Sequence, residues 1–218
     1  MADPAAAGGR PAAGFDHPIF SESVCRIRAL LGATGLVGVE QELLERLVHT
    51  SGDPSIAADL VLGPGGCRRG MEALAAGAVI LTDTAMAAAA VGPMAGRTFA
   101  NPVHSVLTWA PEQAPAGGTR SAEGMAAALA AHPGAVVLIG SAPTALERLL
   151  DLHGQGRVAP PALVIGMPVG FVGVAESKRR LAACDLPQIR LEGSRGGAAL
   201  VAAATNALLR RAWLDQAT

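Results

Sequence analysis

The chain has 218 residues, of which 50% are hydrophobic and 16% are charged, and its formal net charge is −1. This composition excludes a disordered chain, which combines low hydrophobicity with high net charge. It also argues against a nucleic-acid binder, because there is no basic excess and only 3% of the residues are aromatic. Cys25, Cys67 and Cys184 are too few and too far apart for a disulfide scaffold. We therefore expect a cytoplasmic globular protein with enough apolar surface left over for an oligomer.

No segment has the pattern of a targeting signal or a membrane span. Residues 1–14 lack an apolar core and are predicted to form a flexible tail ahead of a single domain over residues 15–218. The longest uncharged stretch, residues 124–146, is interrupted by Pro133, Gly140 and Pro143. A spanning helix needs about 20 mostly apolar residues, so this stretch is interpreted as helix, turn, strand and turn.

The first third of the chain is predicted to be helical. Apolar residues recur near the helical period over residues 19–31 and again over residues 39–49. Glycines end the first of these helices, and the sequence Gly-Asp-Pro at residues 52–54 ends the second. A third helix is predicted over residues 67–76.

From residue 78 onward, short strands alternate with helices. The strands are predicted at residues 78–82, 103–109, 135–139, 162–165 and 188–191. The helices are predicted at residues 83–91, 119–131, 142–153, 174–183 and 196–213. Mostly continuous apolar strands that alternate with helices are typical of a sheet buried on both faces. The sequence therefore predicts an α/β fold with three α/β/α layers, a mostly parallel sheet of about five strands and an N-terminal helical segment.

Three strand-to-helix junctions could bind a ligand, because ligands of such folds lie beyond the carboxyl ends of the strands. They carry Ser141 and Thr144, then Gly170, and finally Arg195 and Gly196. Each junction offers backbone N–H groups at the start of a helix, where anions bind. The alternative is that glycine and proline serve only to turn the chain at these points.

The familiar signatures of nucleotide, metal and serine-hydrolase sites are missing from the sequence. There is no G-x-G-x-x-G fingerprint, phosphate-binding loop, G-x-S-x-G elbow, Cys-x-x-Cys or His-Glu-x-x-His. We therefore predict acid–base chemistry that needs neither cofactor nor metal. His49 is the candidate acid, since an imidazole can hold and release a proton near neutral pH. Its alternative role is to cap the end of its helix. Arg120, followed by Ser121 at another helix start, could bind a carboxylate or could be an ordinary surface arginine.

Seven segments, in order along the chain, resemble the precorrin-8X methylmutase family, also called precorrin isomerase. The most specific are Pro-Val-Gly-Phe-Val-Gly at residues 168–173 and Ala-Glu-Ser-Lys at residues 175–178. The others lie at residues 48–53, 78–83, 119–122, 139–146 and 195–198, and the match starts near Phe15. Ser141 departs from the family, which usually has Asn there, and so does Ala85, where a polar residue is common.

The resemblance implies an isomerase of cobalamin biosynthesis. Such an enzyme moves a methyl group from carbon 11 to carbon 12 of ring C in precorrin-8X, giving hydrogenobyrinate, without a cofactor. It implies that His49 supplies the proton that promotes a sigmatropic shift, and that Ser23 and Arg120 lie near the tetrapyrrole. It also implies a homodimer. Together with the junctions, the predicted substrate-binding residues are Ser23, Arg120, Ser121, Ser141, Thr144, Gly170, Lys178, Arg195 and Gly196.

Three alternatives stay open at this point. The substrate could carry cobalt, which would make the product cobyrinate. The protein could bind a tetrapyrrole without converting it. A nucleotide-dependent enzyme is the third alternative, and the missing glycine fingerprint argues against it.

Overall fold

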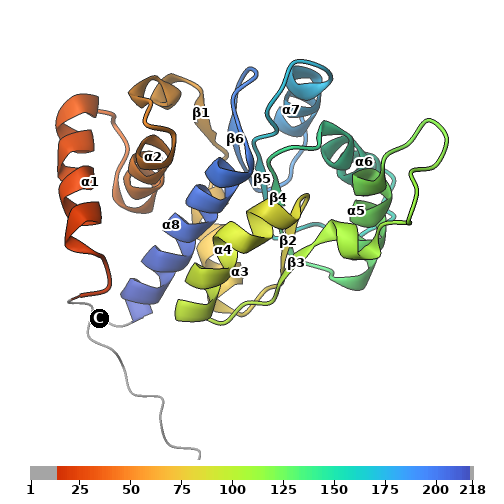
Figure 1. The fold of residues 1–218 in the computed structure, drawn as a ribbon, viewed down its shortest axis with the longest axis horizontal. Coiled ribbons are helices and arrows are strands. Elements are labelled where there is room, and N and C mark those ends of the chain that lie inside the picture. The colour runs from red at the N-terminus through yellow and green to blue at the C-terminus, as the bar shows by residue number, and fades with distance from the viewer. Residues whose placement is uncertain (1–13, 217–218) are drawn as a thin grey trace, which may run out of the picture.

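The computed structural model describes residues 14–216, so nearly all of the predicted N-terminal tail lies outside the described residues. The N-terminal part consists of the helices α1 (Pro18–Leu31) and α2 (Gly38–Ser51) and the 3-10 helix η1 (Pro54–Ala58). Strand β1 (Leu60–Leu62) and helix α3 (Gly66–Ala75) follow. Helix α1 packs along α2 and lies at one end of the molecule (Figure 1).

The remainder alternates strands with helices, as the sequence predicts. Its elements are β2 (Ile80–Thr82), α4 (Ala85–Arg97), β3 (Val103–Ser105), η2 (Val106–Trp109), α5 (Arg120–Ala131), β4 (Val136–Ile139), α6 (Pro143–Gly154), β5 (Leu163–Gly166), α7 (Val174–Ala182), β6 (Gln188–Leu191) and α8 (Ala198–Gln216). The six strands form one sheet in the order β1-β6-β5-β4-β2-β3. All neighbouring pairs are parallel except β1 and β6.

Alternate side chains of the buried strands enter two separate cores, which confirms the three-layer architecture. Val136 and Leu138 of β4 pack with residues of α2, α3, α4 and α8 on one face of the sheet. Val137 and Ile139 of the same strand pack with α5, α6 and α7 on the other face. A period of two along a strand sends neighbouring residues to opposite faces, so both faces must be covered.

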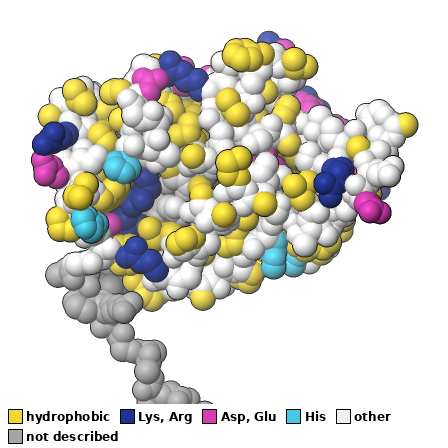
Figure 2. Space-filling model, viewed as in Figure 1, with side chains coloured by type: hydrophobic (Ala, Val, Ile, Leu, Met, Phe, Trp, Pro, Cys, Tyr) yellow, Lys and Arg dark blue, Asp and Glu magenta, His cyan; other side chains and the backbone are white. Residues whose placement is uncertain are grey.

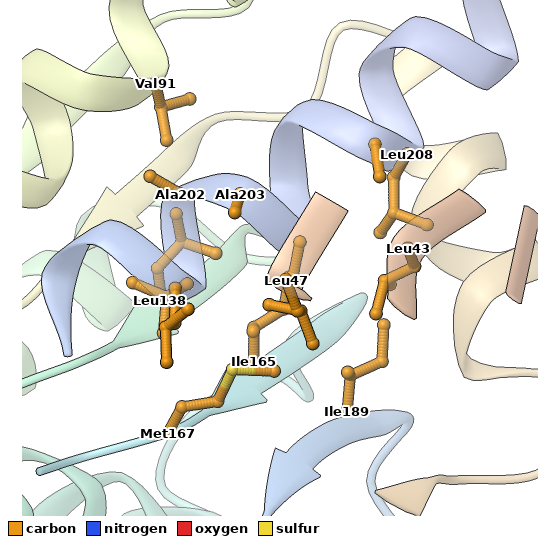
Figure 3. Packing of buried hydrophobic residues seen from close by; sticks show 14 of the residues in the cluster. Leu43, Leu47, Val91, Leu138, Ile165, Met167, Ile189, Ala202, Ala203 and Leu208 are labelled. Atoms are coloured by element: carbon orange, nitrogen blue, oxygen red, sulfur yellow. The ribbon is translucent and has the colours of Figure 1, made fainter. Parts of the chain in front are cut away.

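Helix α8 forms the centre of the larger core. It crosses the sheet and contacts α2, α3 and α4 (Figure 1). Ala202, Ala203 and Leu208 of this helix lie among Leu47, Ile165 and other strand and helix residues (Figure 3). A helix that is apolar almost all round is a buried helix, and its many alanines allow close approach of its neighbours.

Three of the differences between the structure and the sequence predictions have a clear physical reason. Strand β1 was not predicted, because three residues directly after a 3-10 helix give no recognisable alternation. Helix α4 is longer than predicted and continues through Pro93. Both Pro93 and Ala89 are exposed, so the carbonyl that loses its helical partner faces water. The predicted strand over residues 103–109 is a strand only as far as Ser105 and then becomes η2.

The sheet has a topological switch point between β2 and β4. These strands are neighbours, yet the helix after β2 packs in the α8 core and the helix after β4 packs in the opposite core. Ligands of open α/β sheets bind in the crevice that forms at such a point. Within residues 14–216, none of the helices is long and apolar enough to cross a bilayer.

Candidate functional site

His49 lies exposed in the last turn of α2 and is held by a residue of α1. The Oγ atom of Ser23 is 2.8 Å from His49 Nδ1. The two helices run antiparallel, so residues 26 positions apart meet across their interface. This hydrogen bond occupies one ring nitrogen and fixes the ring, which leaves Nε2 as the nitrogen that can exchange a proton with a ligand. The structure thus brings together two of the predicted site residues.

An aromatic ring and a guanidinium complete the surroundings of His49. The Phe20 ring meets the His49 ring edge to face, with 5.1 Å between the ring centroids. The Arg46 guanidinium carbon lies over the Phe20 ring, 4.4 Å from its centroid. Figure 2 shows histidine side chains beside Lys or Arg atoms at the end of the molecule that α1 and α2 form. The family resemblance and the residue patterns did not single out Phe20 or Arg46.

Arg195 connects the end of α2 to the carboxyl edge of the sheet. Its guanidinium donates to Ser55 Oγ at 2.8 Å and lies 3.3 Å from Asp53 and 3.4 Å from Asp59. Asp53 follows His49 by four residues and lies just beyond the end of α2, so this contact ties the end of α2 to the loop that follows β6. The predicted carboxylate-binding Arg195 therefore already has two acidic partners in its own chain.

The amides at the start of α6 are occupied by an internal carboxylate, which differs from the expectation of an open anion site. Asp83 Oδ2 accepts hydrogen bonds from the backbone nitrogens of Gly140, Ser141 and Ala142 at 3.1, 2.6 and 2.7 Å. Asp83 follows β2 and is 1% exposed, and its Oδ1 has no hydrogen-bond partner among the described residues. Burial raises the pKa of this carboxyl, and the three amide donors oppose that shift. The amides at the switch point are therefore bound by a carboxyl group that the protein itself supplies.

Three hydroxyl groups lie near the start of α6, where Asp83 accepts the backbone amides. Thr119 Oγ1 caps α5 by accepting from the Ala122 amide, and it lies 3.3 Å from Ser121 Oγ and 2.8 Å from Thr144 Oγ1. The structure thus joins the predicted Ser121 and Thr144 through a threonine that the sequence analysis missed. Arg120 is exposed next to them and donates through Nε to the carbonyl of Pro111. Hydroxyls and a guanidinium together can bind carboxylates.

Lys178 is fully buried, although its predicted role places it at a ligand-binding rim. Its ammonium donates to the carbonyls of Gly193 and Arg195 at 2.8 and 2.6 Å. Desolvation lowers the pKa of Lys178 to about 8, while Glu192 and Asp59 oppose the shift. In this structure Lys178 shapes the loop that carries Arg195.

Gly170 and Gly196 hold two of the predicted junction loops against each other. Gly170 donates its backbone N–H to the Ser194 carbonyl at 3.1 Å and has a φ of 137°, which side-chain-bearing residues rarely adopt. A Cβ atom on Gly196 would overlap the carbonyl oxygen of Met167. Gly170 is therefore required by its backbone conformation, and Gly196 by the close approach of the Met167 backbone.

Apolar side chains are exposed around the same edge of the sheet. Phe171 and Val172, in the loop after β5, are 94% and 88% exposed, and Met86, at the start of α4, is 68% exposed. Large apolar groups exposed together mark binding surfaces more often than isolated ones do. In residues 14–216 no group of three or more His, Cys, Asp or Glu side chains could hold a metal ion.

Comparisons with known proteins agree on one family. A family model described as CbiC, precorrin-8X methylmutase, matches residues 18–211. A Precorrin-8X methylmutase of Pseudomonas aeruginosa is 42% identical over 87% of this chain and 93% of its own. A Cobalt-precorrin-8 methylmutase of Synechocystis is 36% identical over 92% and 98%. A crystal structure of the precorrin-8X methyl mutase from Thermus thermophilus superposes with a TM-score of 0.81 at 36% identity, covering 90% of this chain and 96% of its own. The chain therefore belongs to the precorrin-8X methylmutase family.

Proposed function

We propose that this protein isomerises precorrin-8X to hydrogenobyrinate by moving the methyl group of ring C from carbon 11 to carbon 12. The observation that carries the proposal is the hydrogen bond between Ser23 and His49, in a chain that belongs to this family. It gives an exposed imidazole with a fixed ring and one free nitrogen, four residues before Asp53, which Arg195 contacts from the loop after β6.

His49 acts as the acid in this reaction. Its Nε2 lends a proton to ring C, the protonated ring makes the methyl shift favourable, and the proton is then returned. The methyl group moves within one molecule, so no atom is gained or lost and no electron acceptor is required. A positioned general acid contributes about 10² to 10⁴ in rate, and the fixed ring supplies part of the required geometry.

The surroundings suit a flat apolar macrocycle with many carboxylate arms. Phe171, Val172 and Met86 offer exposed apolar surface to the disc. The hydroxyls of Thr119, Ser121 and Thr144, together with Arg120, offer donors to its carboxylates. The remaining predicted residues support these surfaces through the backbone contacts described above; they are Ser141, Gly170, Lys178, Arg195 and Gly196.

A second candidate substrate is cobalt-precorrin-8, which would give cobyrinate. The observation in its favour is the name of the Synechocystis relative, which matches nearly the whole length of both chains. The two substrates differ in the metal at the centre of the ring, far from the carboxylate arms.

The test is to add purified protein to precorrin-8X, and separately to its cobalt form, without any cofactor, and to record the absorption spectrum. Conversion to an orange product that absorbs at longer wavelength supports the proposal. His49→Gln should lose roughly 10² to 10⁴ in turnover. His153→Gln is the matched control, because His153 lies in the last turn of α6 and bonds Asp185. Full turnover by His49→Gln would refute the acid role. Product binding without any turnover by the unaltered protein would instead identify a tetrapyrrole carrier.

The active form is a cytoplasmic homodimer in this proposal. Three large apolar side chains are exposed at this end of the molecule: Ile19 and Leu30 of α1 at 72% and 71%, and Val37, just before α2, at 77%. Apolar surface of this kind supports a protein interface. Light scattering at micromolar concentration should give twice the mass of the chain. A monomeric mass would refute the dimer and leave the isomerase proposal standing.

A further inference from the structure

Arg46 lies one helical turn before His49, and both side chains touch the same aromatic ring. The Arg46 guanidinium covers the Phe20 ring and the His49 ring meets it edge to face. Residues three apart on a helix share one face. A ligand that reaches His49 from this face therefore also comes close to Arg46.

Arg46 lacks a carboxylate partner, whereas the other arginines around it are paired. Arg28 donates to Glu45 at 2.6 Å, and Arg210 donates to Asp16 at 2.9 Å and to Glu42 at 2.8 Å. Among residues 14–216, no carboxylate lies within ion-pair distance of Arg46. Burial lowers the pKa of Arg46, with Asp16 and Glu42 opposing the shift from a longer range. A partly desolvated guanidinium gains most from an added anion.

The geometry leaves the donors of Arg46 available. Stacking on Phe20 uses the flat face of the guanidinium, while its N–H groups point outward in the plane. Arg46 lines a cavity of about 240 Å³ between α1, α2 and α8, together with Phe20, Val24 and Arg210. Sites for whole drug-sized ligands measure about 300 to 1,000 Å³, so this cavity suits a side arm and not a macrocycle.

We infer that Arg46 is a substrate-binding residue that receives one carboxylate arm of the tetrapyrrole, close to the carbon that His49 protonates. This inference rests on the proposed function, because it takes the ligand to be a polycarboxylate tetrapyrrole bound against His49. A bidentate contact to an arm that takes no part in the reaction would hold the substrate equally well before and during the methyl shift, so it would add affinity and leave the chemical step nearly unchanged. The three acidic residues that line the cavity are Asp16, Glu42 and Glu45. Each is paired with Arg28, Arg210 or Arg211, which offsets its repulsion of an entering carboxylate.

The experiment compares three variants in the full-length protein with hydrogenobyrinate as the probe. Arg46→Met keeps the apolar stem over Phe20 and removes the charge. Arg46→Lys keeps the charge but loses the bidentate geometry. Arg26→Met is the control, because Arg26 is an exposed residue of α1 that pairs only with Glu22, one turn away, among the described residues. Absorbance titration at two salt concentrations measures the affinity for the product. Steady-state kinetics with precorrin-8X gives kcat and KM, and thermal melting shows whether each variant is folded.

Arg46→Met should weaken product binding and raise KM by roughly ten- to a hundredfold, with kcat changed by less than about threefold. Arg46→Lys should fall between this variant and the unaltered protein, and Arg26→Met should match the unaltered protein. The salt dependence of binding should be smaller in Arg46→Met, because one charge contact is lost. A purely structural role of Arg46 would not raise KM while leaving kcat nearly unchanged, and it would not change the salt dependence of binding.

Equal product affinity for Arg46→Met and Arg26→Met would overturn the inference, and so would a fall in kcat with unchanged affinity. If Arg46→Met does not fold, Arg46→Lys decides the question, and an affinity equal to that of the unaltered protein would overturn bidentate binding. Failure of the unaltered protein to bind the product or convert precorrin-8X would overturn the proposed function itself, which is a different result from either of these.

Discussion

The carboxylate of Asp83 lies 2.6 Å from the backbone nitrogen of Ser141, although 58 residues separate them in the chain. The same oxygen also accepts from Gly140 and Ala142, so one side chain satisfies three amides at the start of α6. These amides would otherwise be orphan donors at the end of a buried strand. Asp83 therefore connects β2 to β4 and α6 at the point where the sheet switches direction.

Asp83→Ala should lower the free energy of unfolding by about 2 to 4 kcal/mol, because buried N–H groups left without a partner cost about 1 to 3 kcal/mol each and water can reach some of them. Asp83→Asn should lose less, since its amide oxygen can still accept. Urea unfolding measures both, with the exposed Glu112→Ala as the control. Sodium formate should raise the melting temperature of Asp83→Ala and not that of the unaltered protein, because a small carboxylate can fill the vacated cradle. Equal stability of Asp83→Ala and Glu112→Ala would contradict this role.

Ser23→Ala should lower kcat roughly tenfold and leave KM nearly unchanged, because the His49 ring loses the contact that fixes it. Steady-state kinetics with precorrin-8X measures both constants. Thr50→Ala is the control, since Thr50 carries an exposed hydroxyl next to His49 in the same helix. An unchanged kcat in Ser23→Ala would show that the hydrogen bond has no catalytic importance.

The buried Lys178 should make stability depend on pH in the alkaline range. Its pKa is about 8 in the folded protein and about 10.4 in an unfolded chain, so the unfolded state binds more protons between these values. The free energy of unfolding should therefore rise as pH increases from 8 to 10, by about 3 kcal/mol at most. Urea unfolding at pH 7, 8.5 and 10 measures this against Lys178→Met, which lacks the titrating group. The difference in stability between the two proteins should change with pH, and a constant difference would refute the prediction.

Gly196→Ala should destabilise the protein by several kcal/mol or displace the loop before α8, because its Cβ would collide with the backbone of Met167 and Pro168. Gly96→Ala is the matched control. Gly96 lies inside α4 with open space at its Cβ position, so that change should leave stability equal or raise it by about 0.5 to 1 kcal/mol. Thermal melting of both variants checks the contrast. Similar melting temperatures for the two variants would mean that the loop can move aside without cost.

The architecture could be predicted from local patterns because its strands are short apolar runs between clear turns. Strand β6 has the predicted bounds, β4 begins one residue later than predicted, and β5 is displaced by one residue at both ends. Strand β1 could not be predicted, since its pairing with β6 depends on a neighbour almost 130 residues away. The same limit applies to α4, where solvent exposure, invisible in the sequence, decides that Pro93 does not end the helix.

The sequence could suggest candidate residues for the site but not the contacts that these residues make. His49, Ser23 and the junction residues could be named from the sequence. Only the three-dimensional structure shows that Arg195 pairs with Asp53 and that Lys178 donates to a backbone carbonyl of its own chain. Asp83 left one usable signal, an acid directly after a continuous apolar strand. No sequence signal shows that Arg46 lacks a carboxylate partner in the described part of the chain. That depends on which carboxylates of α1, α2 and α8 pair with the other arginines of these helices.

The internal carboxyl group of Asp83 means that this part of the candidate site is ordered before any ligand arrives. The amides after β4 do not need a visiting carboxylate to become ordered, and Thr144, which follows them, is already in contact with Thr119. A macrocycle with many rotatable arms loses much freedom when it binds, and a rigid receptor adds little to that entropic cost. The protein therefore pre-forms one wall of the candidate site, and in the proposed function discrimination between tetrapyrroles would rest on shape at that wall.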